Sequence, residues 1–429
     1  MNKYSDYKLT HIDWLGKIPS HWILTKNRFG FKKKRNGDNE EIKTNVLSLT
    51  TKGIKIKKDL TFGKTSASYI GHQLVKKGDL VFTPRDFDQT PILSDVSKYD
   101  GCISNLYIVD EVKDNLINHY VNYFWYGLKY SVNYFKNFSH GMRYSFNRYQ
   151  FDEIPILIPP IKEQKLITSF LDKKINGINL LIEKIYRKIE LLKKQRTLLI
   201  NQSVTKGLDL KVEMKHSGVE WIGKIPKHWD KFIIRYLTEE HRQGFYTSDP
   251  YDDEGIPILR ITDIQDDHSL KYGDSPKYNR PKKEIHNFLV KQGDFLFPRT
   301  GGVGRFGIID FDQPCIYGSF LIRFRWKKNI SINFLKFFFQ SNIFQDQVKQ
   351  EIHGGVNQNV HVENIKNCLL FKPSLEEQKN ISNHLEKITS KIDKKISLEK
   401  SRTQLLSEYC QSLISSVVTG KVRIREDML

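Results

Sequence analysis

Two stretches of the chain carry a sustained helical pattern of apolar residues. Between Glu163 and Ser203 there is no proline and only one glycine, and apolar residues recur in alternating steps of four and three. The positions of this seam are Leu171, Ile175, Ile178, Ile182, Ile185, Ile189, Leu192 and Leu199, with Arg196 as an interruption. Four or more heptads with charged flanks predict a coiled-coil helix. About 40 such residues would form a rod of roughly 60 Å.

The second stretch runs from Ser374 to Gly420 and repeats this design. Ser374 and Glu377 have the spacing of a capping box, while Pro159-Pro160 marks the start of the first helix and Gly207 its end. The second seam consists of Leu385, Ile392, Ile396, Leu406, Leu413 and Val417, and polar or small residues interrupt it at Thr389, Glu399, Thr403 and Cys410. Because each seam must be covered, we expect the two helices to pair antiparallel and to separate two globular domains in a dumbbell.

The segments outside the helices are aromatic and irregular, and they predict two globular domains. Short β-type runs occur at residues 45–50, 79–82, 256–261 and 320–326, and helical patches occur at 116–129 and 332–351. The predicted fold class is α+β, with two mixed α/β domains and two long antiparallel coiled-coil helices in a pseudo-twofold tandem repeat. The expected boundaries are an N-terminal segment at 1–22, a first domain at 23–158, a central helix at 159–207, a repeat of the N-terminal segment at 208–229, a second domain at 230–373, and a distal helix with a tail at 374–429.

The tandem repeat is visible in three places. The nine residues from Trp14 to Trp22 recur from Trp221 to Trp229 with seven identities, at an offset of 207. Glu163-Gln164-Lys165 recurs as Glu377-Gln378-Lys379, and the run 75–85 matches 290–299. A period above 200 residues indicates two copies of a domain-sized unit.

The four tryptophans Trp14, Trp22, Trp221 and Trp229 bracket the repeated Gly-Lys-Ile-Pro motif. We expect them to be buried anchors that join each globular domain to a helix end. The alternative is an exposed stacking platform for single-stranded nucleic acid.

The composition favours a folded protein with a polyanionic partner. Lys and Arg number 69 against 49 Asp and Glu, so the 429-residue chain has a formal net charge of +20, and 39% of its residues are hydrophobic. This apolar content excludes a wholly disordered chain, and the positive surplus favours an acidic ligand. No segment resembles a signal peptide or approaches 18 apolar residues, and the four cysteines form no close pair. We therefore expect a cytoplasmic protein with reduced thiols, no zinc site and no membrane partner.

Familiar catalytic motifs are absent from the sequence. There is no HExxH motif, P-loop or nucleophile elbow, and the strings at 249–251 and 158–161 fail to match an adenine methyltransferase loop. The glycine cluster 301–307 precedes Ile308 and Ile309, which are β-type residues, so a turn between strands is favoured over a nucleotide-binding loop. A third possibility is that its small residues let Arg299 or Arg305 approach a DNA groove. We predict no catalytic residue, no metal and no cofactor.

Taken together, these features resemble the specificity subunit of type I restriction-modification systems. The resemblance rests on the string from Ser217 to Trp229, on the Pro-Pro-x-x-Glu-Gln sequence that starts at Pro159, and on the duplicated layout of a globular domain followed by a helix. It covers essentially the whole chain. The loop from Pro84 to Gln89 departs from the pattern, because it lacks the glycines of its counterpart in the second domain.

The resemblance implies two target recognition domains that each read one half of a split, asymmetric sequence in double-stranded DNA. It also implies that the helices set the spacing and dock two modification subunits, which would methylate adenine with S-adenosylmethionine. Restriction subunits that combine a motor and a nuclease would join them in some systems.

Base readout requires paired hydrogen-bonding groups, such as those of Arg for guanine and of Asn or Gln for adenine. Near the end of each domain, residues 141–147 align with 355–361 at an offset of 214. A polar loop that caps a strand is the plain alternative. The predicted DNA-binding residues in these segments and elsewhere in the two domains are Arg85, Arg143, Tyr144, Asn147, Arg260, Arg299, Gly301, Gly302, Arg305, Asn357, Gln358 and Asn359.

Three further segments are candidates on charge or position. Lys32, Lys33, Lys34 and Arg35 precede Asn36-Gly37, which predicts a loop that contacts phosphates or is simply solvated. The helical residues 162–196 include ten Lys or Arg and four acidic residues. This positive excess would contact DNA phosphates, face a partner protein or keep the helix soluble. By the resemblance, residues 241–247 and 260–263 lie at strand edges and loops of a recognition domain.

The sequence thus predicts a non-catalytic DNA-specificity subunit. One alternative is a coiled-coil scaffold that binds RNA or protein, although no aromatic signature of RNA-binding sheets recurs in both copies. Another is a self-contained methyltransferase, which would have to bind S-adenosylmethionine itself.

Overall fold

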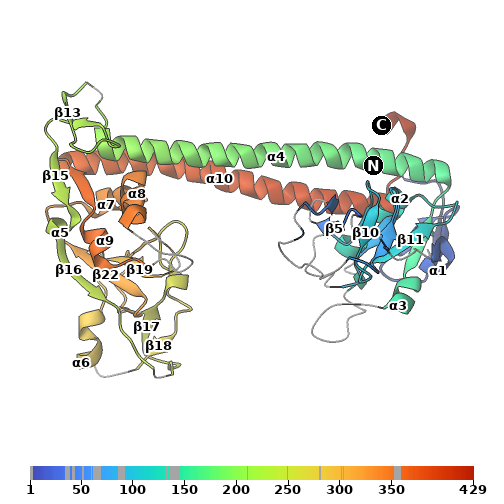
Figure 1. Ribbon diagram of the computed structural model, residues 1–429, viewed down its shortest axis with the longest axis horizontal. Coiled ribbons are helices and arrows are strands. Elements are labelled where there is room, and N and C mark those ends of the chain that lie inside the picture. The colour runs from blue at the N-terminus through green and yellow to red at the C-terminus, as the bar shows by residue number, and fades with distance from the viewer. Residues whose placement is uncertain are drawn as a thin grey trace. The chain divides into compact units, whose positions relative to one another are not determined.

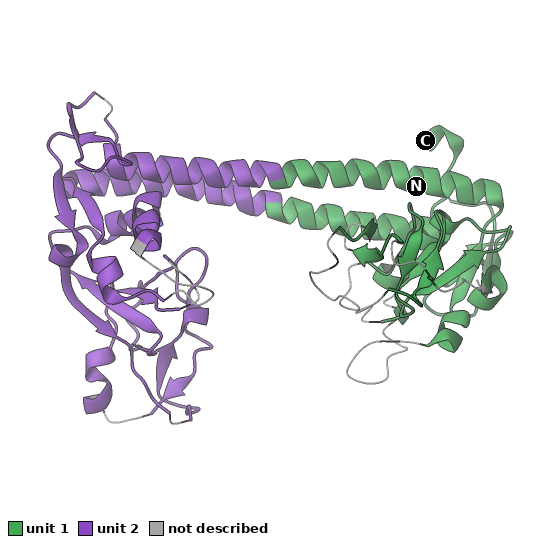
Figure 2. Cartoon of the chain, in the orientation of Figure 1, with its two compact units in different colours: residues 1–186, 400–429 green, residues 187–399 purple. Residues whose placement is uncertain are grey.

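The computed structural model describes residues 3–33, 39–40, 44–50, 53–58, 60, 69–85, 92–131, 134–135, 145, 147–209, 211–248, 250–279, 282–300, 302, 304–351 and 359–429. The chain divides into two compact units (Figure 2). Unit 1 comprises residues 1–186 and 400–429, and unit 2 comprises residues 187–399. Each unit holds one mixed α/β domain and a segment of each of two long helices, α4 and α10 (Figure 1).

Unit 1 is built on a four-stranded antiparallel sheet in the order β4-β11-β8-β9. Its strands are β4 (Phe31–Lys33), β11 (Ile108–Val112), β8 (Leu80–Phe82) and β9 (Ser94–Val96). Antiparallel pairs accompany the sheet: β1 (Tyr7–Leu9) with β2 (Lys17–Pro19), β3 (Ile23–Lys26) with β12 (Pro155–Ile158), β5 (Leu47–Thr50) with β6 (Gly53–Ile56), and β7 (Gln73–Val75) with β10 (Gly101–Ile103). The helices are α1 (Asn27–Gly30), α2 (Asn118–Ser131), α3 (Arg148–Asp152), the N-terminal part of α4 (Ile161–Lys206) and, in the tail, η4 (Glu426–Met428).

The core of unit 1 is aromatic. Trp125 of α2 packs edge-on to Phe82 of β8, with ring centroids 4.8 Å apart, and Phe151 of α3 lies 5.1 Å from Phe82. All three side chains are buried. Because these rings come from a strand and two helices, their burial holds the helices against the sheet.

Unit 2 repeats the arrangement with a four-stranded antiparallel sheet in the order β16-β22-β19-β20. Its strands are β16 (Thr238–Gln243), β22 (Leu321–Trp326), β19 (Phe295–Pro298) and β20 (Gly307–Ile308). Beside it lie a three-stranded sheet of β18 (Lys277–Tyr278), β17 (Ile256–Leu259) and β21 (Ile316–Tyr317), and the pairs β13 (Met214–His216) with β14 (Lys224–Pro226) and β15 (Asp230–Ile233) with β23 (Leu369–Lys372). The helices are α5 (Ile234–Leu237), η2 (Ile261–Asp263), α6 (Lys282–Ile285), η3 (His286–Phe288), α7 (Ile332–Gln340), α8 (Asn342–Glu351), α9 (Val362–Lys366) and the N-terminal part of α10 (Leu375–Val418).

Phenylalanines dominate the core of unit 2. Phe339 of α7 packs edge-on to Phe297 of β19 at 5.1 Å and to Phe344 of α8 at 4.6 Å. The predicted helical patch at 332–351 is therefore present, but it breaks at Ser341 into α7 and α8. The break lets both short helices turn their rings into one cluster.

The two long helices follow the predicted seams. Leu171, Ile185 and Ile189 of α4 are buried, and the seam positions between them are half-buried, while most of their neighbours are exposed. The predicted ends hold as well. The helix α4 begins directly after Pro160, and Gly207, which follows its last residue, has a φ of +71°, the left-handed conformation in which glycine commonly ends a helix. Local periodicity is sufficient to specify these elements.

Within each unit the segments of α4 and α10 run antiparallel. In unit 2, Lys188 Nζ lies 2.5 Å from Glu399 Oε1, and further along α4 Arg196 Nε donates to Asp393 Oδ1 at 3.0 Å. Arg196 and Glu399 interrupt the two apolar seams, and each of them thus forms an ion pair with a residue of the other helix. Polar partners at such positions favour one register over its alternatives.

The repeated motif joins each domain to the start of a long helix. Trp22 and Trp229 are fully buried, and their Nε1–H groups donate to Glu163 and Glu377 respectively, each at 3.0 Å. His21 and His228 contact the same two carboxylates at 2.6 and 3.0 Å. The motif recurs because the same junction is built twice.

Two expectations about this junction are wrong. Trp221 is 48% exposed rather than buried, since the ring lies on the turn before β14 and outside the domain core. Only one of the two hydrogen bonds of the predicted capping box at Ser374 forms, in which Ser374 Oγ accepts from the Glu377 N–H. The Glu377 carboxylate binds Trp229 and His228 instead of the backbone.

Candidate DNA interface

In both units, two candidate segments that are distant in sequence lie side by side. In unit 1, Arg85, which follows β8, forms an antiparallel bridge with Ser145, which precedes α3. In unit 2, Thr300 after β19 forms the same bridge with Asn359 before α9. The Val360 N–H donates to the Arg299 carbonyl at 2.7 Å and extends this contact. The fold therefore brings together the two groups of residues in which base readout is predicted.

The short helices α3 and α9 fix the second segment of each pair. Asn147 caps α3, where its Oδ1 accepts from the Gln150 N–H at 3.0 Å, and His361 occupies the corresponding position before α9. These positions are 214 residues apart, as in the sequence alignment. The side-chain oxygen of Asn147 therefore serves the backbone of α3, in a cap of a helix rather than the cap of a strand that the plain alternative described.

The glycine cluster connects β19 to β20, so the prediction of a turn between strands is confirmed. Within it, Arg305 is half-buried and donates to the Ile264 carbonyl at 2.6 Å. A Cβ on Gly302 would lie 3.1 Å from Arg305 Cδ, so the glycine leaves room for the arginine to fold back. Part of the Arg305 guanidinium therefore holds the loop in place.

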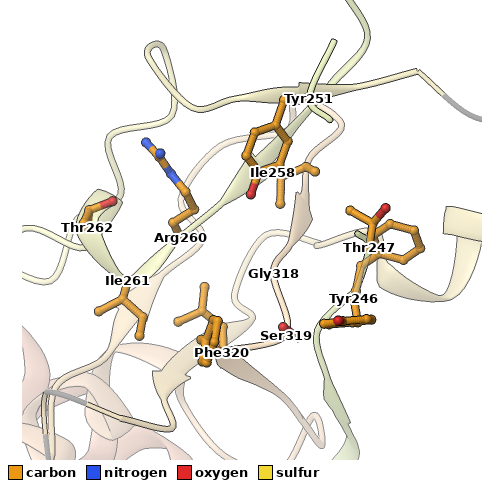
Figure 3. A pocket seen from close by; sticks show the side chains of 12 residues that line it. Tyr246, Thr247, Tyr251, Ile258, Arg260, Ile261, Thr262, Gly318, Ser319 and Phe320 are labelled. Carbon is orange, nitrogen blue, oxygen red and sulfur yellow. The ribbon is translucent and has the colours of Figure 1, made fainter. Parts of the chain in front are cut away.

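Arg260 lines a pocket of about 390 Å³ in unit 2, and the backbone of Arg299 is hydrogen-bonded to another of its lining residues. The Arg299 N–H donates to the carbonyl of Phe320, which lines the pocket, at 2.9 Å. The Arg260 side chain is exposed at the pocket wall, 3.4 Å from Asp263 Oδ1 (Figure 3). The residues that line the pocket are Phe245, Tyr246, Thr247, Tyr251, Ile258, Arg260, Ile261, Thr262, Gly318, Ser319, Phe320 and Leu321.

The structure describes only part of the basic cluster at residues 32–35. Lys32 and Lys33 lie in β4, at the edge of the four-stranded sheet, so the prediction of a loop is wrong for these two residues. The pairing of β4 with β11 extends the strand to Lys33. Seven other candidates lie outside the described residues: Lys34, Arg35, Arg143, Tyr144, Gly301, Asn357 and Gln358.

Several arginines hold the fold together and are not part of the candidate interface. Arg325 donates to both oxygens of the buried Asp294, at 2.8 and 2.7 Å. Burial opposes the charge on Arg325, but these hydrogen bonds and the nearby acids outweigh it and raise the pKa of the guanidinium. Arg323, which is 2% exposed, pairs with Glu240 on the neighbouring strand. The net positive charge alone therefore overstates how many cations are available to DNA.

The described part of the chain offers no cluster of three or more metal-ligating side chains. Cys102, Cys315 and Cys368 are buried cysteines, and burial raises the pKa of the Cys315 thiol to about 11. This thiol stays protonated and behaves as a small apolar core residue. Among the described residues, no helix combines the length and hydrophobicity needed to cross a membrane.

Sequence reasoning missed two aromatic residues of the pocket, Tyr251 and Phe320. Their only local signal is an aromatic side chain in a segment that ends a loop or begins a strand. Nothing in the linear pattern relates them to Arg260 or to each other, because they come from separate segments of unit 2.

The fold and the paired segments are those expected of a DNA-recognition protein, and comparison identifies its family. The model of the type I restriction modification DNA specificity domain matches residues 23–191 and 226–406. The chain therefore belongs to this family. It is the DNA specificity subunit of a type I restriction-modification system, in which catalytic activity lies in the partner subunits.

The relatives agree along most of the chain. The type I restriction enzyme MjaVIII specificity subunit of Methanocaldococcus jannaschii is 23% identical over 335 residues, covering 76% of this chain and 75% of its own. The putative MjaX specificity subunit of the same organism is 24% identical over 446 residues, covering 99% and 98%. The fold also resembles a chain from a structural study of complex assembly and conformational transition of the type I R-M system. The TM-score is 0.66 at 12% identity, and the match covers 94% of this chain and 99% of that chain. The predicted family, and the predicted fold of two mixed domains with two packed long helices, are confirmed.

Proposed function

We propose that each unit reads one half of a bipartite, asymmetric sequence in double-stranded DNA. The observation that carries this proposal is the bridge between the two candidate segments, which recurs at equivalent positions in both units. Arg85 contributes to it in unit 1, and Arg299, Thr300 and Asn359 contribute in unit 2. Because the segments that carry these side chains differ between the units, the two units would read different bases.

We take the boundaries of the domains from the sequence repeat. Residues 23–158 form the first recognition domain and residues 230–373 the second, while the helices at 159–207 and 374–429 set the gap between the half-sites. Residues 1–22 and 208–229 would join each domain to a helix start through the Trp22 and Trp229 junctions.

The long helices would also dock two modification subunits, one for each repeat. Leucines outside the seams support this role. In unit 2, Leu191 and Leu198 of α4 and Leu398 of α10 are exposed, and in unit 1 Leu405 of α10 is exposed. Seven-residue spacing places Leu191 and Leu198 on one face of α4, and exposed apolar residues that share a face are typical of a protein-binding surface.

Catalysis would come from these partners. The modification subunits would bind S-adenosylmethionine and methylate adenine, and restriction subunits would join the assembly where the system has them. Since the ligand is genomic DNA, we place the complex in the cytoplasm.

Replacing residues 23–158 with the corresponding domain of a relative tests the modular readout. The hybrid subunit, expressed with its modification subunits, should methylate a target that differs in one half only. A target changed in both halves, or in neither, would contradict independent reading by the two units.

A further inference from the structure

The pocket beside Arg260 has the size and the walls of a ligand site. Its volume of about 390 Å³ falls in the range of small-molecule sites. In the view of Figure 3, Tyr251 and Phe320 lie on opposite sides of the space, and Tyr246 and Arg260 lie on two others. All of the lining residues belong to unit 2.

Three aromatic rings around this pocket are exposed to water. Tyr246 is 77% exposed, Phe320 is 64% exposed and Tyr251 is 56% exposed. They come from three separate segments: the chain after β16, the chain before β17, and the turn before β22. Large apolar side chains that converge at a surface cavity mark a binding site rather than a folding requirement.

The polar groups at the pocket complement the rings. Thr247, Thr262 and Ser319 add hydroxyl groups to the lining, and Arg260 adds a guanidinium. Asp263 fixes the Arg260 backbone, since Asp263 Oδ2 accepts from the Arg260 N–H at 2.8 Å and from Ser275 Oγ at 2.9 Å. Flat apolar walls with hydrogen-bonding groups at the rim suit a planar heteroaromatic ring, which is the form of a nucleobase.

Two backbone hydrogen bonds link the pocket to the candidate DNA interface. The Arg299 N–H binds the Phe320 carbonyl at 2.9 Å, and the Arg299 carbonyl binds the Val360 N–H at 2.7 Å. One short stretch of backbone thus connects a pocket wall to the segment that holds Asn359. We therefore expect a duplex bound at that segment to lie close to the pocket.

We propose that this pocket binds one nucleobase of the second half-site, displaced from the duplex stack and held between Phe320 and Tyr251. The inference rests on the proposed function, because it needs duplex DNA at unit 2. The pocket would make specificity depend on how easily that base pair opens, in addition to the hydrogen bonds made in the groove.

A fluorescence scan tests the proposal on the complete complex with its modification subunits. Once the target is known, 2-aminopurine is placed at each position of the second half-site in turn, and its emission is compared with and without protein. We expect enhanced emission at one position besides the methylated adenine, whose own extrusion belongs to the modification subunits. Phe320→Ala and Tyr251→Ala should abolish this enhancement and weaken binding by roughly 5- to 150-fold, the range for loss of one stacked base.

Tyr236→Ala is the matched control, because Tyr236 is an equally exposed tyrosine of unit 2 (61%) that does not line the pocket. It should retain the enhancement. A mismatch at the identified base pair should strengthen binding by the wild-type complex, since opening then costs less, and Phe320→Ala should remove this gain.

Two outcomes would overturn the proposal in distinguishable ways. If the complex binds its bipartite target but no second position is enhanced, or if the pocket variants keep the enhancement, the pocket does not hold a base and the proposed function stands. If the complex binds no bipartite target, the proposed function fails and this inference fails with it.

Discussion

At the residue scale, Glu163 and Glu377 decide how each domain meets its long helix. Each carboxylate accepts from the buried indole of a tryptophan and contacts the adjacent histidine. A buried N–H without an acceptor is costly, because it has lost its hydrogen bond to water. The pairing of Trp with Glu therefore explains why these residues recur together in the two repeats.

Replacing Glu377 with Ala should destabilise unit 2 by about 1–3 kcal/mol, because it leaves the Trp229 indole buried without its acceptor. Urea unfolding monitored by tryptophan fluorescence measures the loss. Glu376→Ala is the control, since it removes an exposed acid from the same first turn of α10. Equal losses in the two variants would show that the interaction with the helix dipole, and not the indole hydrogen bond, is responsible.

Arg299 is the residue whose role in readout is most directly testable. If its side chain reads a base, Arg299→Ala should cost about 1–3 kcal/mol at one position of the second half-site and leave the other positions unchanged. Binding to a set of single-base variants of the target measures this, with Lys328→Ala as an exposed cation control in the same unit. Uniform weakening on every sequence would make Arg299 a phosphate contact.

At the element scale, the long helices could be predicted closely and the pocket could not. The seam from Leu171 to Leu199 is a local pattern, so its periodicity alone specifies α4, and the repeat then specifies α10. The duplication drew attention to the segment that holds Ser145, but its bridge to Arg85 could not be predicted, because only the fold brings these two segments together. Tyr251, Arg260 and Phe320 carry no such pattern, because only the assembled strands β17, β21 and β22 bring them together.

The break at Ser341 is another feature that could not be predicted from the sequence. The apolar residues between Ile332 and Glu351 are compatible with one helix, but the phenylalanines of α7 and α8 fill a single core only when the chain turns between them. Tertiary packing decides such a break, and local propensity does not.

The helices should act as the ruler between the half-sites. Deleting one heptad from α4 and its partner heptad from α10 shortens the paired rod by about 10 Å, which corresponds to about three base pairs of duplex. The gap in the methylated sequence should shrink by a similar amount, as mapped from the sites modified by the altered complex. An unchanged gap would mean that another part of the assembly sets the spacing.

At the scale of the whole molecule, duplication supplies two reading domains from one design. Half-sites read from one face of the duplex lie about 34 to 36 Å apart. The 46 residues of α4 extend over about 69 Å, which is longer than this separation.

The most direct test of bipartite readout is a genome-wide map of N6-methyladenine in cells with and without this gene. Our account predicts that the gene adds methylation at one motif, composed of two unlike half-sequences separated by a gap of fixed length and unspecified bases. Methylation at a single uninterrupted motif, at two halves with a variable gap, or no difference between the two maps would contradict it.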